Sequence, residues 1–343
     1  MRPLTSVGVM LLALATGCST RSDGNAERLT GGGSSLIGPL MTKWAGAYFR
    51  GTGNQVDYTI SGSGNGIRQM IDQKNDFGCT DAPMNDEQLT KAKSLGGEVL
   101  HIPLVMGGVV PAYHLEAISE PLRFSGPVLA DIFLGKITRW DDARLKELNP
   151  KTDLPKLDIA VVHRAEGSGT TYVWVEYLSK VSPEWKEKVG VGTDIKWPVG
   201  IGAQMNDGVA SQINRTVGAI GYVELTFALK SNLSYGYVVN AAGVPVRATL
   251  DSITKAAEGA AASIPDDLRY SLTNAPGAEA YPICATVWAV VYAKQNPAKA
   301  KALRDFFRWV LHEGQESTAE LSYARLSKNL VEKAERKLEK LGP

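Results

Sequence analysis

The sequence predicts an α/β fold with largely parallel sheets, divided into two domains. The first observation is a strand-like run followed by a short turn of serine and glycine and then a helix, an order that occurs three times. The second is an ordinary globular composition, with 44% hydrophobic and 21% charged residues. The third is the length of 343 residues, which exceeds what one small core accommodates. Alternating strands and helices favour parallel strands covered by helices.

The first strand, turn and helix unit begins near Arg28. A strand-like run over 28–30 leads into a glycine and serine turn over 31–35, and Pro39 follows where the first turn of a helix accepts proline. The apolar side chains that then repeat at the spacing of one helix face are Leu40, Trp44 and Tyr48.

The second and third units have the same order. Alternating apolar residues over 56–60 precede the turn 61–66, and a strand-like run over 157–162 precedes the segment 164–170. A helical period follows each of the two turns. Short turns rich in hydroxyl groups and glycine therefore precede three predicted helices, where they can act as caps or as anion sites.

Periodicity and turn residues predict the remaining elements. The further helices are expected over 86–95, 128–134, 141–148, 207–212, 298–313 and 329–341. The further strands are expected over 105–113, 219–223 and 284–292, with a turn or hairpin over 240–246. Alternating charges over 332–340 are typical of a helix face exposed to water.

The N-terminal segment is typical of an export signal. Residues 1–17 combine a basic start with an apolar run over 7–15 that is too short to span a bilayer as a helix. Gly17-Cys18 resembles a lipobox, which predicts lipidation of Cys18 and a flexible tether over 18–27; ordinary signal cleavage is the alternative. Both alternatives place the protein in the periplasm or at the cell surface, and a lipid anchor at Cys18 would be its membrane contact.

Charge and cysteine content limit the possible partners. The net charge of +1 argues against nonspecific nucleic-acid or membrane-surface binding, which needs a basic face. Export leaves Cys79 and Cys284 in a compartment that permits disulfides, so they form either a disulfide or two buried free thiols. The four histidines are scattered and form no metal-binding pattern, so no metal or cofactor is expected.

Two segments far apart in the chain describe a pocket for a small oxyanion that carries a proton. The segment 164–170 supplies the positive fork of Arg164, then hydroxyl and backbone N–H groups at the start of a helix. The segment 80–83 supplies Asp81, whose carboxylate repels an anion unless the ligand brings a hydrogen for it to accept. Protonated phosphate has such a hydrogen, whereas sulfate at neutral pH has none.

Enzyme templates do not fit the sequence. Ser63 and Ser168 lack the glycine two residues upstream that a nucleophile elbow needs, 135–137 lacks the rest of a P-loop, and 62–66 is no dinucleotide fingerprint. Without a metal cluster, a phosphatase would also lack its usual route to a nucleophile. We therefore expect binding without catalysis. An extracellular phosphatase or phosphoester hydrolase, and a binder of another oxyanion such as sulfate or arsenate, are the alternatives.

Five segments carry a resemblance to a known family, and they occur in the order 29–35, 76–83, 134–140, 164–170 and 218–224. They resemble the periplasmic phosphate-binding proteins (PstS type) of the bacterial phosphate ABC importer, and the resemblance extends from about residue 28 to the C-terminal helices. It implies a two-lobed periplasmic-binding-protein fold of type II with the ligand cleft between the lobes. Lobe I is then expected over 28–104 plus 281–343, and lobe II over 105–280.

The resemblance also implies a ligand set and a partner. Glu166, where the family commonly has Asp, is expected to hold the guanidinium of Arg164, and Ser35 stands where the family usually has Thr. The partner would be the membrane permease of the importer, to which the protein delivers inorganic phosphate. The residues expected to bind phosphate are Ser35, Leu36, Ser63, Asp81, Arg164, Ser168, Gly169 and Thr170.

Overall fold

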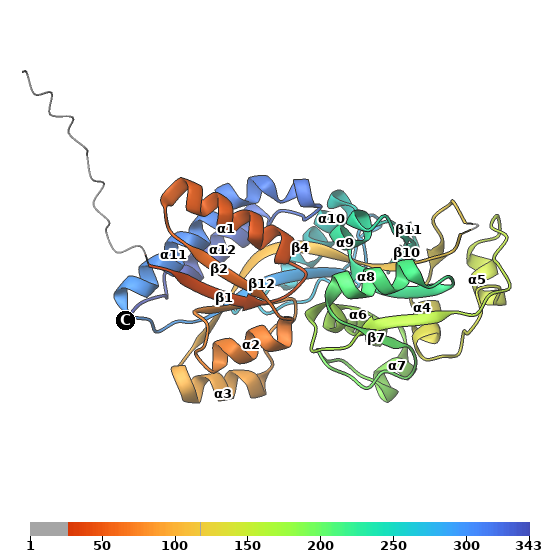
Figure 1. The fold of residues 1–343 in the computed structure, drawn as a ribbon, viewed down its shortest axis with the longest axis horizontal. Helices are drawn as coiled ribbons and strands as arrows, with labels where there is room; N and C mark the ends of the chain where they lie inside the picture. The colour runs from red at the N-terminus through yellow and green to blue at the C-terminus, as the bar shows by residue number, and fades with distance from the viewer. Residues whose placement is uncertain (1–26, 117) are drawn as a thin grey trace, which may run out of the picture.

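The computed structural model describes residues 27–116 and 118–343. The predicted export signal, the lipidation site at Cys18 and nearly all of the tether lie outside the described residues. Figure 1 shows two α/β lobes along the long axis of the molecule, with long strands running between them. None of the described helices has both the length and the apolar character that a bilayer crossing requires.

The sheet of lobe I contains both parallel and antiparallel strands. β1 (Leu29–Gly33) lies between β2 (Val56–Ile60) and β3 (Phe77–Thr80), and all three are parallel. β3 then pairs antiparallel with β12 (Cys284–Tyr292), and β12 pairs antiparallel with β4 (Val99–Tyr113). The expected largely parallel sheet is therefore wrong at its centre, because β4 and β12 run between the lobes in opposite directions.

The long strand β4 continues the sheet into lobe II. Its first part pairs with β12 up to Gly108, and from Val109 it pairs with β8 (Ala219–Glu224). β8 is followed in the sheet by β6 (Ala160–Arg164) and β7 (Ile201–Ala203), which are parallel to one another. We propose that the chain crosses between the lobes where β4 changes partner and again at the start of β12, within a few residues of the boundaries expected from the sequence.

Proline explains why the start of β4 was not predicted. The strand begins at Val99 rather than at residue 105. Pro103 lies in the unpredicted part, and a proline in a strand normally argues against a central position because it donates no hydrogen bond. The register with β12 shifts between Val287 and Trp288, so that Trp288 faces Pro103 and Val287 faces Val105. This β-bulge accommodates the proline inside the sheet.

Helices cover both faces of each lobe's sheet. Figure 1 shows α1, α11 and α12 on one face of the lobe I sheet and α2 and α3 on the other. In lobe I the bounds are α1 (Gly38–Thr52), α2 (Ser63–Ile71), α3 (Asp86–Gly96), α11 (Pro297–Leu311) and α12 (Lys328–Leu338). The other helices are α4 (Gly126–Phe133), α5 (Ala143–Leu148), α6 (Gly169–Val181), α7 (Pro183–Lys188), α8 (Met205–Arg215), α9 (Leu225–Lys230) and α10 (Leu250–Ala260).

Short elements complete the fold. β9 (Ser234–Tyr235) pairs with the end of β4, and a small separate sheet contains β5 (Arg123–Phe124), β10 (Tyr237–Val239) and β11 (Pro245–Val246). The antiparallel pair of β10 and β11 confirms the hairpin expected over 240–246. The predicted helices are confirmed with shifted ends, whereas α7, α9 and α10 were not predicted.

The two described cysteines are separate, buried free thiols. They lie on neighbouring strands, but the register pairs Cys79 with Ala289, five positions along β12 from Cys284. Five residues of strand span roughly 16 Å, whereas a disulfide needs Cα atoms within about 7 Å. The Sγ of Cys284 donates a hydrogen bond to the carbonyl oxygen of Tyr281 at 3.1 Å. The possible disulfide is therefore wrong, and the alternative of two free thiols is confirmed.

Candidate anion-binding site

The three turns that were singled out in the sequence meet where the two lobes touch. The turn after β1 leads into α1, the turn after β2 leads into α2, and the turn after β6 leads into α6. In lobe I the parallel strands β1 and β2 end at the same edge of the sheet, which brings the two turns that follow them together. β6 of lobe II runs in the opposite direction, so the turn at its end faces the other two across the contact between the lobes. The backbone N–H of Gly64 in lobe I donates to the carbonyl oxygen of Gly167 in lobe II at 3.2 Å. The lobes are thus in direct contact at this site.

Glycines allow α2 to pack directly on the strands of lobe I. A Cβ atom on Gly66 would lie 2.6 Å from the Cα of Gly33, and one on Gly78 would lie 2.6 Å from the carbonyl oxygen of Gly66. No larger residue fits such an approach. The close packing places the start of α2 beside the end of β3, where the backbone N–H of Asp81 donates to Ser63 Oγ at 3.3 Å.

Asp81 is a buried carboxyl group that contacts both lobes. Only 2% of the residue is exposed. Its Oδ1 accepts a hydrogen bond from the Ser34 hydroxyl of lobe I, and its Oδ2 accepts one from the Thr170 hydroxyl of lobe II at 3.4 Å. Burial raises the pKa of Asp81 to about 6, although Ser34, Arg164 and Thr170 act in the opposite direction. The structure therefore places a carboxyl group that changes charge near neutral pH at the contact between the lobes.

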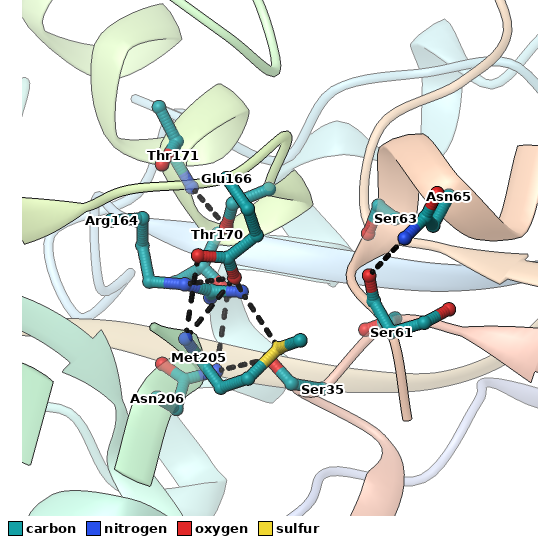
Figure 2. A network of polar contacts seen from close by, with 12 residues as sticks. Ser35, Ser61, Ser63, Asn65, Arg164, Glu166, Thr170, Thr171, Met205 and Asn206 are labelled. Atoms are coloured by element: carbon teal, nitrogen blue, oxygen red, sulfur yellow. Dashed lines mark hydrogen bonds and ion pairs between the residues drawn. The ribbon is translucent and has the colours of Figure 1, made fainter. Parts of the chain in front are cut away.

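Arg164 supplies a buried positive charge to the same site. Its side chain is 1% exposed, and its Nε donates to Glu166 Oε1 at 2.8 Å while Nη2 forms an ion pair with the same oxygen. Its Nη1 donates to Thr170 Oγ1 at 3.4 Å. Figure 2 shows the guanidinium between Glu166 and the start of α8. The pairing of Glu166 with Arg164 is as expected, and it fixes the direction of the fork.

The start of α8 holds Glu166 from the other side. The backbone N–H of Met205 lies 3.2 and 3.4 Å from the two carboxylate oxygens of Glu166. Met205 has a φ of +59°, a left-handed conformation that costs free energy for a residue with a side chain. Such strain persists only where the surroundings fix the backbone, and it often occurs at functional sites.

The other predicted residues lie at the same place, but several of their polar groups already have partners. Ser168 caps α6, because its Oγ accepts from the backbone N–H of Thr171 at 3.1 Å. The backbone N–H of Leu36 donates to Ser34 Oγ at 3.1 Å. Gly169 faces lobe I so closely that a Cβ atom would lie 2.5 Å from Ser63 Oγ. Ser35 lies in the turn before α1 and is 4% exposed.

The sequence did not single out three buried polar residues of this region. Ser34 orients Asp81, Asn206 at the start of α8 donates to Ser35 Oγ at 3.1 Å, and Glu224 caps α9 by accepting from the backbone N–H of Thr226 at 2.9 Å. Burial raises the pKa of Glu224 well above its usual range. The neighbouring pair of serines over 34–35 could have pointed to Ser34. No serine and glycine turn precedes Asn206.

The arrangement suits the binding of a small oxyanion. It combines a guanidinium held by the carboxylate of Glu166, several hydroxyl groups, helix N-termini and the buried carboxyl group of Asp81. Within residues 27–116 and 118–343, no group of three or more His, Cys, Asp or Glu side chains could hold a metal ion.

Comparison with known proteins identifies a family and relatives of this chain. The sequence model of a family described as a PBP superfamily domain matches residues 19–313. The chain is 44% identical over 334 residues to the phosphate-binding protein PstS of Xylella fastidiosa. The aligned residues cover 96% of this chain and 90% of the relative. It is 40% identical over 310 residues to PstS of Pasteurella multocida, with 90% and 89% covered.

Solved structures show the same fold. A phosphate-binding protein from Stenotrophomonas maltophilia superposes with a TM-score of 0.67 at 18% identity, over 90% of this chain and 93% of that one. A second structure, an ABC-type phosphate transport receptor from Vibrio cholerae, superposes with a TM-score of 0.57 at 17% identity, over 87% of this chain and 100% of that one. At these identities the likeness concerns the fold.

Proposed function

Because the chain belongs to the PstS family of phosphate-binding proteins, we propose that it captures inorganic phosphate between its two lobes and delivers it to the permease of an ABC importer. The observation that carries this proposal is a buried carboxyl group, Asp81, next to the buried guanidinium of Arg164. Together they suit an anion that needs a counter-charge and also has a hydrogen to donate. The protein catalyses nothing in this proposal.

Each predicted residue has a separate role in the proposal. Arg164 supplies the counter-charge, held in place by Glu166, and Asp81 accepts the hydrogen of the phosphate. The remaining predicted residues supply hydroxyl or backbone N–H donors from both lobes, so that closure of the lobes surrounds the anion and removes water from it. These donors are Ser35, Leu36, Ser63, Ser168, Gly169 and Thr170.

The cellular setting follows from the N-terminal sequence and the relatives. We propose that the protein is exported and anchored by a lipid on Cys18, with the permease subunits as its partner. The export signal over 1–17 supports the first part, and the family supports the second. Radiolabelled fatty-acid incorporation that disappears in Cys18→Ala would support the anchor, whereas a mature N-terminus at another residue would contradict it.

Calorimetric titration of refolded, ligand-stripped protein tests the function. We expect one phosphate to bind per chain, arsenate to compete, and sulfate to bind far more weakly because it brings no hydrogen for Asp81. The pure protein should not hydrolyse a chromogenic phosphate ester. Turnover of the ester would favour the phosphatase alternative, and equal affinity for sulfate would favour a binder of another oxyanion.

Gly169→Ala is expected to weaken phosphate binding by preventing full closure. A Cβ atom at this position would lie 2.5 Å from Ser63 Oγ and 2.7 Å from the Cβ of Asp81, both on the opposite lobe. Overpacking of this kind costs about 1–3 kcal/mol, which corresponds to roughly 5- to 150-fold in affinity. Titration calorimetry measures the loss, and small-angle X-ray scattering at saturating phosphate measures the opening of the lobes.

Gly167→Ala provides the matched control for Gly169→Ala. A Cβ atom on Gly167 would lie 3.5 Å from the Cα of Gly64, an ordinary contact distance. Phosphate affinity and lobe closure should therefore change little. Similar losses in both variants would show that the effect comes from the turn itself and that contact across the lobes at Gly169 does not limit binding.

A further inference from the structure

Asn206 connects the two lobes through groups that the proposed function assigns to phosphate. It is fully buried at the start of α8 in lobe II. Its Nδ2 donates to Ser35 Oγ of lobe I at 3.1 Å and to Thr170 Oγ1 of lobe II at 3.4 Å. Figure 2 shows the Asn206 amide between these two hydroxyl groups. A single amide nitrogen thus contacts one proposed ligand group from each lobe.

The backbone fixes which end of the Asn206 amide faces the site. The backbone N–H of Glu224 donates to Asn206 Oδ1 at 3.1 Å. Because an N–H group can only donate, the oxygen end of the amide must face β8 and the nitrogen end must face the two hydroxyls. The strained Met205, next in the chain, holds this end of α8 through Glu166. The amide therefore has one defined orientation.

A donor that faces a hydroxyl group decides where the hydroxyl hydrogen points. Ser35 Oγ accepts from Asn206, so its own hydrogen must point elsewhere. Among the described residues, Ser35 Oγ has no second hydrogen-bond partner, which leaves its hydrogen for an anion at the lobe contact. Thr170 Oγ1 accepts from both Asn206 and Arg164, and it donates its hydrogen to Asp81. The Ser35 hydroxyl is thereby held as a donor toward the site, and the Thr170 hydroxyl is held as a donor to Asp81.

We infer that Asn206 is a positioning residue that orients the Ser35 hydroxyl as a donor to the bound anion, holds the Thr170 hydroxyl as a donor to Asp81, and links the two lobes when they meet. This inference rests on the proposed function, because it gives a role to groups that are assigned to phosphate. Asn206 itself does not bind the anion. Its contribution depends on Ser35, and this dependence is what distinguishes orientation from general support of the fold.

A double-mutant cycle measures that dependence by calorimetric titration with inorganic phosphate. Asn206→Ala is expected to weaken binding about tenfold, because the hydroxyls regain rotational freedom and the link between the lobes is lost. In a Ser35→Ala background the same change should cost about threefold or less, because only the contact with Thr170 is left to lose. Equal losses in both backgrounds would overturn the inference. Circular dichroism melting of each variant checks that it is folded.

Asn206→Asp provides a second measurement with nearly unchanged shape. The introduced carboxylate accepts from both hydroxyls, which turns the Ser35 hydrogen away from the anion and the Thr170 hydrogen away from Asp81, and it adds a negative charge. We expect phosphate binding about 100-fold weaker at pH 8, partly restored at pH 5 when a protonated carboxyl donates again. Both Asn206 variants keep the other charged groups of the site, which are Asp81, Arg164, Glu166 and Glu224. The ratio of the two variants' phosphate affinities therefore reports only the titration of the introduced carboxyl group. A ratio that is independent of pH would contradict the inference.

A control variant and Arg164→Ala distinguish a wrong role for Asn206 from a wrong position of the phosphate site. Asn214→Asp makes the same change at an exposed position of the same helix, where the amide contacts Ser231, and it should leave phosphate binding unchanged. If Arg164→Ala abolishes binding while every Asn206 variant binds like the parent protein, only the role of Asn206 is wrong. If Arg164→Ala and the Asn206 variants all bind normally, the proposed site is wrong as well.

Discussion

Arg164→Ala is expected to weaken phosphate binding more than any other single change at the site. The guanidinium is the buried positive charge at the contact between the lobes, with 1% of its side chain exposed. Breaking a buried charge pair typically costs about 3–5 kcal/mol, which is roughly 100-fold or more in affinity. Titration calorimetry with phosphate measures the loss directly. Near-unchanged affinity would place the binding site elsewhere in the molecule.

Part of this loss arises from Glu166, which the substitution leaves without its partner. A carboxylate beside the anion then repels it, in addition to the missing counter-charge. Adding Glu166→Gln to Arg164→Ala should therefore recover part of the affinity. Arg139→Ala is the matched control, because Arg139 is 46% exposed and forms surface ion pairs with Asp141 and Asp158, which contribute about 0–1 kcal/mol. It should leave phosphate binding unchanged.

The central groups of the candidate site could be predicted because each of them lies at or just after the end of a strand, in a turn that a helix follows. The turns before α1, α2 and α6 contain serine and glycine, and such turns can be recognised from the local sequence alone. Asp81 stood out because a carboxylate is unusual beside an anion site. The structure brings Asp81, Arg164 and Thr170 together, with Thr170 contacting the other two.

Asn206 and Glu224 could not be predicted in the same way. Their roles depend on how α8 and β8 of lobe II pack against the first turn of lobe I, and no local pattern in the sequence reports such a contact. The cysteines show the same limit. The two thiols lie on adjacent strands, but only the register decides whether they can meet, and register depends on the whole sheet.

The start of β4 and the whole of α10 were not predicted, and each omission has a local reason. Pro103 made the first part of β4 unlike a central strand, although a bulge accommodates it. The helix α10 was not predicted because its buried face contains small residues, Ala256 and Ala260, next to Ile253, and alanine gives only a weak apolar period. In both cases tertiary packing decided the structure where the local preference was weak.

Asp81→Asn is expected to change anion selectivity more than it changes phosphate affinity. Sulfate has no hydrogen for the Asp81 carboxylate, so the two negative groups repel one another in a site with little water, at a cost of roughly several kcal/mol. An asparagine removes the charge and offers an amide donor to either anion. The ratio of the sulfate and phosphate dissociation constants should therefore fall by about 100-fold, with phosphate itself weakened modestly.

The pH dependence of sulfate binding tests the same group without a mutation. Burial raises the pKa of Asp81 to about 6. Above that pH the carboxylate repels sulfate, and below it the neutral acid can donate a hydrogen bond to sulfate. Sulfate affinity of the parent protein should thus rise about tenfold per pH unit from pH 8 to pH 6 and level off below. In Asp81→Asn it should stay nearly constant over this range.

Two control variants attribute the pH effect to Asp81. Glu224 is another buried carboxyl group near Asp81, and burial also raises its pKa. Its side chain caps α9, so we expect Glu224→Gln to show the same pH dependence of sulfate binding as the parent protein. Asp158→Asn is the same substitution at a side chain that is 87% exposed. It should leave the dissociation constants of sulfate and phosphate unchanged. If sulfate binds the parent protein as tightly as phosphate at pH 8, or if Asp81→Asn leaves the ratio unchanged, then Asp81 is only a turn residue. The hydrogen of the phosphate would in that case not be what the site recognises.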